Sequence, residues 1–224
     1  MITTTALRFQ YFFDPLCGGC YASAPALVAL ADAHGAQVRM MPSGLFAGAR
    51  PITTMADFAW RNDQRIGALT GQPFTEAYHS QVLLAPDGVF DSTAPTRALV
   101  ALGELDGSLE RRFLHQVQIA RYVEGEDTCQ PEVAARIAAA VARRAGIALE
   151  ANALADRLRS DARLQALADG RIREAQDAMR TMGISGVPQL VVVAENRRHV
   201  ISGEDLYSGK DVLLTRIATL SAAS

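Results

Sequence analysis

The sequence of 224 residues has no long hydrophobic run, no excess of either charge and few cysteines. No apolar stretch approaches the roughly 20 residues that a membrane-spanning helix needs. The opening residues, from Met1 to Thr5, lack the basic and apolar regions of a secretory signal. We therefore expect a cytoplasmic protein that has no membrane partner.

The balance of charge argues against a polyanionic partner. The chain carries 22 basic and 24 acidic side chains, for a formal net charge of -2 and an isoelectric point near 6.1. No Lys/Arg block provides the local positive field that gathers phosphates. Nucleic acid is thus not an expected partner.

Three cysteines are too few for a disulfide scaffold in a chain of this length. Cys17 and Cys20 lie three residues apart, whereas Cys129 stands alone. A structural zinc site needs about four ligands. No second paired spacing exists among the remaining candidates, which are Cys129, His34, His79, His115 and His199. We therefore expect no bound metal and look for another chemistry at the cysteine pair.

Both ends of the chain have the texture of an α/β fold. Residues 7–13 form a short apolar and aromatic run, typical of a strand that is buried on both faces, and the run ends at Asp14 and Pro15. A helix is expected from Cys20 to the His34-Gly35 pair, followed by a second strand over residues 37–41. This order predicts a right-handed βαβ unit with Cys17 at the strand-to-helix junction.

The middle of the chain, residues 50–182, has helical texture without β-branched runs. Apolar residues at three- and four-residue steps predict helices over residues 95–105, 109–122, 131–145 and 161–182. Strands are expected again at 188–193 and 199–201, separated by a turn at Glu195-Asn196, and a helix at 212–220. The sequence thus predicts an α/β frame interrupted by an all-helical insertion.

The motif Cys17-Gly18-Gly19-Cys20 carries the expected chemistry. Unpaired amides and the helix dipole at a helix N-terminus favour a negative charge, so Cys17 is the expected thiolate and attacking sulfur. In such motifs the first thiol pKa falls from about 8.5 to roughly 3.5–7.5. Cys20, one turn further in, is expected to resolve a mixed disulfide. The spacers Gly18 and Gly19 neither remove an amide nor add a charge.

The residues at both ends of the chain carry a resemblance to a known family. Residues 11–21, YFFDPLCGGCY, resemble the active-site segment of the DsbA family, especially its cytoplasmic FrnE-like branch. The Gly186-Val187-Pro188 segment is similar to the cis-proline loop of that family. Residues 70–74 and 122–125 resemble this branch more weakly, and Pro25 is similar to the helix-kinking proline of thioredoxins.

The resemblance implies a thioredoxin fold, βαβ plus ββα, in which residues 1–49 and 183–224 form the thioredoxin-like domain and 50–182 the helical insertion. It also implies a cis peptide bond before Pro188, facing the cysteines. A cis-proline offers no N–H, and it presents the backbone of Val187 to an extended substrate beside the mixed disulfide. Val187 and Pro188 are therefore expected to bind substrate.

One family feature is missing from this sequence. Thioredoxins and DsbA proteins resemble one another in holding a buried acid six residues before the first cysteine, but Tyr11 occupies that position here. Asp14 is the carboxylate nearest in sequence to Cys20. It is a candidate for proton transfer, although an Asp before Pro is more commonly a turn residue.

Other residues favour structural roles. Cys129 is expected to be a lone surface thiol rather than a relay for the disulfide. Phe58, Trp60, Ile66 and Leu69 indicate an apolar helix face that packs in the core, with substrate stacking as the alternative. The four histidines are scattered and are expected to be surface or packed residues.

The expected function is disulfide exchange with protein or small-molecule thiols and disulfides. No cofactor is expected beyond the redox-active cysteines, with glutathione as a candidate co-substrate. In a reducing cytosol the resting form should be the dithiol, which favours reduction or isomerisation over bulk oxidation. The alternatives are a glutathione-dependent isomerase related in fold to 2-hydroxychromene-2-carboxylate isomerase, which generally has Ser at the first active position, and a binding protein with an inert cysteine pair. Nothing in the pattern requires an oligomer.

Overall fold

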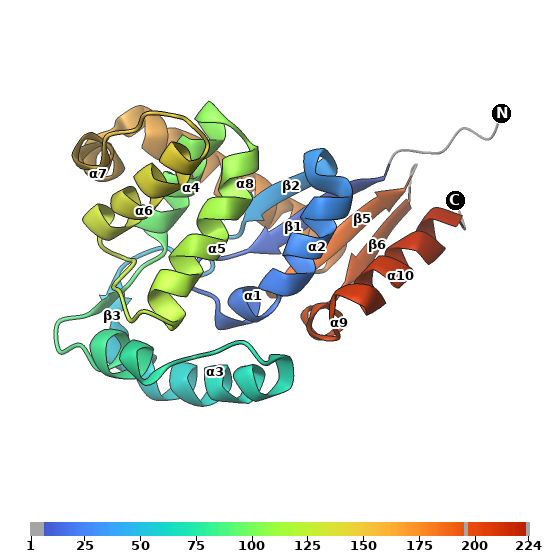
Figure 1. The fold of residues 1–224 in the computed structure, drawn as a ribbon, viewed down its shortest axis with the longest axis horizontal. Helices are drawn as coiled ribbons and strands as arrows, with labels where there is room; N and C mark the ends of the chain where they lie inside the picture. Colours follow the sequence, from blue (N-terminus) through green and yellow to red (C-terminus); the bar gives the residue numbers. More distant parts are fainter. Residues whose placement is uncertain (1–6, 195–196, 223–224) are drawn as a thin grey trace.

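The computed structural model describes residues 7–194 and 197–222, and in these segments a four-stranded sheet is joined to a group of helices (Figure 1). The strands of the sheet have the order β2-β1-β5-β6. β1 is parallel to β2 and antiparallel to β5, and β5 is antiparallel to β6. The strands are β1 (Arg8–Phe13), β2 (Val38–Pro42), β5 (Gln189–Ala194) and β6 (Arg197–Ile201). This is the thioredoxin fold expected from the sequence.

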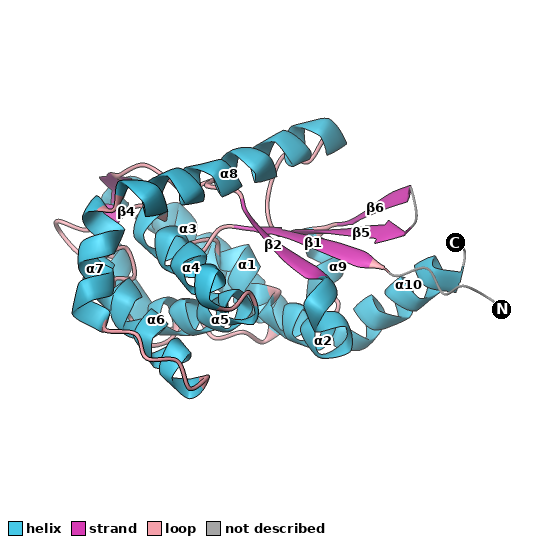
Figure 2. Ribbon diagram, turned by 90° about the horizontal axis from the view of Figure 1, so that it is seen from above, coloured by secondary structure: helices cyan, strands magenta, loops and turns pink. Residues whose placement is uncertain are grey.

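Helices cover both faces of the sheet, which explains the continuous apolar run of β1. Figure 2 shows α8 (Ala162–Met182) on one side, with α2 (Ala24–His34) and α10 (Lys210–Ala222) on the other. Phe12 packs on the α8 side with Ala175 and Val191, whereas Phe9 and Phe13 belong to the large core on the opposite side. All three phenylalanines are fully buried.

The region between β2 and β5 is mainly helical. Its long helices and its π-helical segment η3 are α3 (Ala56–Thr70), η3 (Tyr78–Leu83), α4 (Thr93–Leu105), α5 (Ser108–Tyr122), α6 (Pro131–Arg144), α7 (Ala151–Ser160) and α8. The predicted helices at 95–105, 109–122, 131–145 and 161–182 agree with α4, α5, α6 and α8 within two residues at each end.

Short elements complete the fold. They are α1 (Gly18–Ala22), the 3₁₀ turns η1 (Gly35–Gln37) and η2 (Ile52–Thr54), and α9 (Gly203–Tyr207). The region expected to be all-helical also holds a two-stranded antiparallel ladder of β3 (Arg50–Pro51) and β4 (Val89–Phe90). Strands of two residues are too short to show a period-2 pattern, so the sequence did not reveal this ladder.

The apolar face predicted for residues 58–69 is only partly correct. Ile66 is buried and Trp60 is half-buried, stacked on His79 at a ring distance of 4.3 Å. Phe58 and Leu69, however, are 63% and 66% exposed, so core packing was the wrong expectation for both. Phe58 and Leu69 lie eleven residues apart, on one side of α3. The side of α3 that packs inward is a different one, which includes Asp63 and Ile66.

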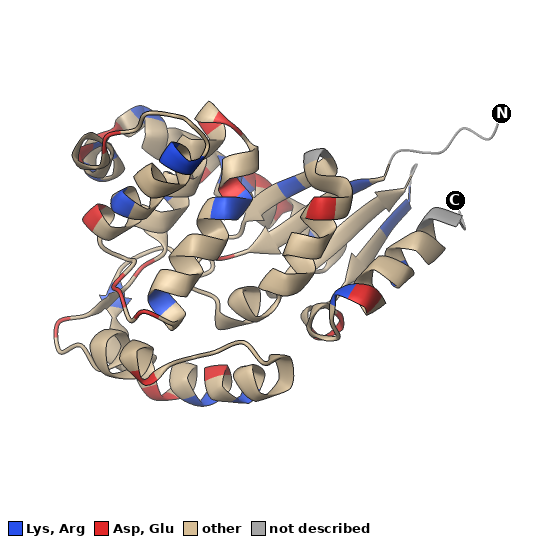
Figure 3. Ribbon diagram, in the orientation of Figure 1, with Lys and Arg blue, Asp and Glu red and all other residues tan. Residues whose placement is uncertain are grey.

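Charged residues are mixed over the surface. Figure 3 shows acidic and basic positions alternating along α3, and no face in this view is dominated by basic residues. None of the helices in the described part of the chain combines the length and apolar character needed to cross a bilayer. The N-terminal segment and the turn expected at Glu195-Asn196 lie outside the described residues.

Candidate active site

Cys17 and Cys20 lie where β1 passes into the first helices. Cys17 is the N-cap of α1, and its Sγ accepts a hydrogen bond from the backbone N–H of Cys20 at 3.4 Å. Cys17 is 9% exposed and Cys20 is 1% exposed, and both are free thiols. The thiol at the helix start is therefore the more accessible of the two, in the arrangement that an attacking and a resolving cysteine require.

Burial separates the chemistry of the two sulfurs. Burial, together with hydrogen bonding and charge interaction with Cys17, raises the pKa of Cys20 well above its ordinary value. The backbone of Asp14 opposes this shift, while the Asp14 carboxylate adds to it. At neutral pH Cys20 is therefore held as a thiol.

The cis-proline loop faces the first cysteine. The peptide bond between Val187 and Pro188 is cis, and the Cys17 thiol donates to the carbonyl oxygen of Val187 at 3.6 Å. Pro188 also approaches the motif itself, because a Cβ added to Gly19 would lie 3.1 Å from its Cδ. The structure thus brings together the two segments that the sequence placed 170 residues apart.

Tyr11 fills the place of the missing acid. It is 1% exposed, its hydroxyl is 2.7 Å from the Ser23 Oγ, and it donates to the carbonyl of Cys20 at 3.4 Å. Burial raises its pKa well above the ordinary value, so the hydroxyl stays neutral. Ser23 separates α1 from α2, with Pro25 in the first turn of α2. The hydrogen bonds of Tyr11 therefore fix the junction between α1 and α2.

Asp14 is fully buried and strongly hydrogen-bonded. Its carboxylate accepts from the backbone N–H of Leu16 at 3.0 Å, from the N–H of Phe46 at 3.1 Å and from the Ser92 hydroxyl at 3.0 Å. Burial raises its pKa although these three donors lower it. Asp14 thus ties the motif loop to the segment after β2 and to the start of α4, and it interacts electrostatically with Cys20.

Two side chains that sequence reasoning missed flank the motif. A Cβ placed on Gly18 would lie 2.0 Å from Oδ1 of Asp63, and one placed on Gly19 would lie 2.5 Å from the hydroxyl oxygen of Tyr207. Asp63 belongs to α3, which packs against α1, and Tyr207 ends α9. No local pattern marks either residue, because each reaches the motif from a distant element.

Cys129 is half-buried rather than on the surface, so the expected exposure was wrong. It packs beside a fully buried arginine, and Arg121 donates to its sulfur at 3.8 Å. Burial raises the pKa of Cys129 to about 11 in spite of this positive charge. Among the described residues, no group of three or more His, Cys, Asp or Glu side chains is placed to hold a metal ion.

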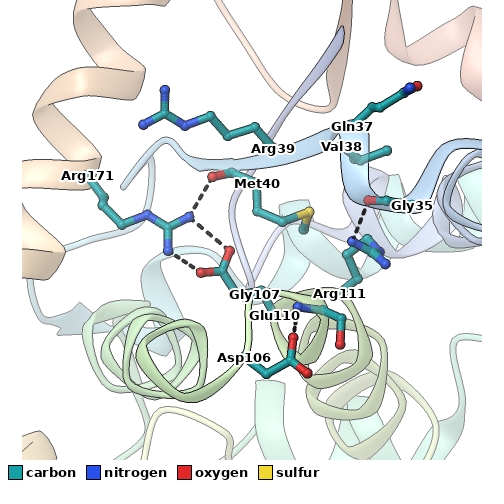
Figure 4. Close-up of a pocket in the computed structure, with 11 residues that line it drawn as sticks. Gly35, Gln37, Val38, Arg39, Met40, Asp106, Gly107, Glu110, Arg111 and Arg171 are labelled. Atoms are coloured by element: carbon teal, nitrogen blue, oxygen red, sulfur yellow. Dashed lines mark hydrogen bonds and ion pairs between the residues drawn. The ribbon is translucent and has the colours of Figure 1, made fainter. Parts of the chain in front are cut away.

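One pocket lies away from the cysteines. It has a volume of about 580 Å³ and is lined by β2, the start of α5 and Arg171 of α8 (Figure 4). Arg171 donates to both carboxylate oxygens of Glu110 and, at 2.7 Å, to the carbonyl of Met40. The guanidinium of Arg171 thus joins α8 to α5 and to β2 through these hydrogen bonds. A smaller apolar groove of about 240 Å³, which includes Leu45, Met179, Ile184 and Val187, adjoins the cis-proline loop.

Comparison with known proteins agrees with this geometry. Residues 9–209 match the model of the DSBA-like thioredoxin domain. The cytosolic disulfide reductase DsbM from Pseudomonas aeruginosa is 27% identical, with a TM-score of 0.83 over 97% of this chain and 100% of that chain. The same protein solved with GSH is 29% identical, with a TM-score of 0.79 over 95% and 98% of the two chains.

A more distant structural neighbour shares only the fold with this chain. The structure of a 2-hydroxychromene-2-carboxylate isomerase is 16% identical, with a TM-score of 0.53 over 96% of this chain and 98% of that chain. No curated protein sequence matched. On the match over residues 9–209, the chain belongs to the DSBA-like thioredoxin domain family and is a DsbA-like thiol–disulfide oxidoreductase.

Proposed function

We propose that this protein reduces disulfides in the cytoplasm, with Cys17 as the nucleophile and Cys20 as the resolving thiol. The observation that carries the proposal is the position of Cys17. It caps α1, is more exposed than Cys20 and lies against the Val187 carbonyl of the cis-proline loop. The DsbM likeness, to a protein described as a cytosolic disulfide reductase, supports the reducing direction.

The reaction proceeds in two exchanges. The Cys17 thiolate attacks one sulfur of the substrate disulfide, forms a mixed disulfide and releases the other sulfur as a thiolate, which takes up a proton. Cys20 then loses its proton and attacks the Sγ of Cys17, which releases the second substrate thiol and leaves a Cys17–Cys20 disulfide. A thiol reductant such as glutathione returns both cysteines to thiols, so no other cofactor is needed.

Substrate binding is assigned to the cis-proline loop. An extended substrate would lie along Val187 and Pro188, with an apolar side chain in the adjoining groove of Leu45, Met179 and Ile184. Both protein and small-molecule disulfides fit this scheme. The DsbM structure solved with GSH supports glutathione as the co-substrate. Membership of the FrnE-like branch stays a prediction.

Asp14 is proposed to receive the proton of Cys20. The two groups interact electrostatically, and burial raises the pKa of both. An Asp14→Asn variant should slow the resolving step and shift the pH dependence of its rate. A pH–rate profile identical to wild type would show that Asp14 has only a structural role, which is to accept three hydrogen bonds in the motif loop.

Reduction of insulin by the cysteine variants, with glutathione as the reductant, tests the proposal. Cys17→Ser should lose activity entirely, and Cys20→Ser should accumulate a mixed disulfide on Cys17 that mass spectrometry detects. Cys129→Ser serves as the matched control and should keep full activity. Disulfide reduction retained by Cys17→Ser would remove Cys17 from the mechanism.

The second candidate is a glutathione-dependent isomerase, which the shared fold of the 2-hydroxychromene-2-carboxylate isomerase suggests. A serine at position 17 suits such an enzyme, because glutathione rather than the protein supplies the thiol. Isomerase activity that survives in Cys17→Ser would therefore favour this candidate. An inert binding protein would instead show slow alkylation of Cys17 at neutral pH.

A further inference from the structure

A buried carboxyl group lies against the first turn of α1. Asp63 of α3 is 4% exposed, and its Oδ1 occupies the space that any side chain at position 18 would need. Its Oδ2 accepts a hydrogen bond from the Tyr78 hydroxyl at 3.0 Å. The carboxyl therefore has a defined place beside the motif, on the side of Gly18.

The same carboxyl shares its surroundings with the Cys17 sulfur. The hydroxyl of Tyr207 lies over Gly19, and the Cβ position of Gly19 is 3.6 Å from the Cys17 Sγ. Tyr207 interacts electrostatically with Cys17 and with Asp63. Because Gly18 and Gly19 carry no side chains, the Asp63 carboxyl and the Tyr207 hydroxyl both lie close to the backbone turn that holds Cys17.

The groups that face Asp63 determine when it is charged. Tyr78 of η3, Arg121 and Tyr122 of α5, and Tyr207 of α9 surround it, with Asn62 beside it on α3. Burial raises the pKa of Asp63 to about 7, although Tyr78, Arg121 and Asn62 lower it. Arg121 is a positive charge among these groups, and it also faces Cys129 and Asp127. Arg65, on the same helix as Asp63, interacts electrostatically with Tyr207.

We propose that Asp63 is a positioning residue of the redox centre, whose charge controls how readily Cys17 forms its thiolate. An ionised Asp63 carboxylate beside the start of α1 repels the negative charge of a Cys17 thiolate, whereas a protonated carboxyl does not. The carboxyl exchanges its proton with solvent, and no bond to substrate forms. This inference rests on the proposed function, since it names a control over the nucleophile of that site.

The rate of Cys17 alkylation by iodoacetamide, followed from pH 5 to 9 on the reduced full-length protein, tests this control. Fragment-ion mass spectrometry assigns the label to Cys17 rather than to Cys20, which lies on the same peptide, and Cys129 is followed on a separate peptide. Asp63→Asn should alkylate about 3- to 10-fold faster than wild type at pH 7.5. The ratio should fall to about one at pH 5.5, where the wild-type carboxyl is itself protonated.

Two further variants separate charge from packing. Tyr78→Phe removes a donor that lowers the pKa of Asp63, so its alkylation should exceed wild type only in a window around pH 7. Asp57→Asn removes an exposed acid from the first turn of the same helix and should match wild type throughout. A ratio for Asp63→Asn that is constant with pH, or equal to one at every pH, would overturn the proposal.

The test also distinguishes failure of this inference from failure of the proposed function. Alkylation reports ionisation of Cys17 whether or not the protein reduces disulfides. If insulin reduction fails but the pH-dependent ratio is found, the control by Asp63 stands and the assigned activity does not. If reduction depends on Cys17 but the ratio is flat, the activity stands and Asp63 is a structural residue.

Discussion

At the scale of single residues, the motif has glycines at positions 18 and 19 because there is little room for a side chain at either position. Neither has a positive φ, so backbone conformation does not demand them. Asp63 is held against Gly18 by Tyr78, and Tyr207 lies over Gly19. The motif therefore excludes bulkier spacers because two side chains from other elements already occupy their positions.

Replacement of Gly18 by alanine tests this account of the motif. The added methyl group meets the Asp63 carboxyl, so Gly18→Ala should lower the free energy of unfolding by about 1–3 kcal/mol, measured by urea denaturation. The same change made in an Asp63→Ala background should cost much less, since the obstructing group is gone. Equal costs in the two backgrounds would show that Asp63 does not set the size of residue 18.

Cys129 is expected to be chemically quiet. With its pKa raised to about 11 by burial, only a small fraction is thiolate at pH 8, so its alkylation should be slow compared with Cys17. Oxidised protein digested without reduction should contain the Cys17–Cys20 disulfide alone. Recovery of a Cys17–Cys129 disulfide in stoichiometric amount would restore the relay that the sequence left open.

At the scale of elements, Arg171 joins the helical region to the sheet. It lies on α8 and binds Glu110 of α5 and the carbonyl of Met40 on β2, as Figure 4 shows. Glu110 is buried and lies against Gly103 of α4, where a Cβ would be 2.0 Å from its Oε1. One ion pair thus fixes the relative positions of four elements.

Removal of this contact should loosen the whole arrangement. Arg171→Met leaves the Glu110 carboxylate buried without its partner, and we expect a loss of about 1–3 kcal/mol in unfolding free energy. The Arg171→Met/Glu110→Gln double variant should lose less than the sum of the two single losses. Additive losses in urea denaturation would indicate that the pair is not coupled.

At the scale of the whole molecule, stability should depend on pH in the direction set by the buried acid. The pKa of Asp63 is raised from 3.8 to about 7, so between these values the folded state binds more protons than the unfolded state. Stability from this group is therefore present below about pH 4 and is lost as pH rises through about 7. Asp14, whose pKa is also raised, acts in the same direction.

The size of this effect can be measured with the isosteric variant. Wild type should lose on the order of 2–4 kcal/mol of unfolding free energy through Asp63 between pH 4 and pH 8. Asp63→Asn should show a shallower pH dependence and should exceed wild type in stability at pH 8. The same slope in both proteins, from urea denaturation at each pH, would contradict the raised pKa.

Much of the frame followed from local sequence patterns. The apolar run at 7–13 predicted β1, the three- and four-residue periodicity predicted α4, α5, α6 and α8, and the cysteine spacing indicated Cys17 and Cys20 as the candidate pair. The two-residue strands β3 and β4 and the π-helical η3 were not predicted, because none of them is long enough to show a hydrophobic period. The exposed Phe58 and Leu69 were misplaced because hydrophobicity alone does not say which side of a helix meets the core.

By itself, the amino-acid sequence was enough to predict which residues carry the chemistry, since Cys17, Cys20 and the Val187-Pro188 loop are recognisable from spacing and neighbours. The tertiary structure alone decided what surrounds them. Asp63, Tyr207 and the Arg171–Glu110 pair approach from elements far apart in the chain, and their contacts depend on how α3, α9 and α8 pack. Packing between distant segments has no local signature, so the groups that lie beside the cysteine motif are brought there only when the chain is folded.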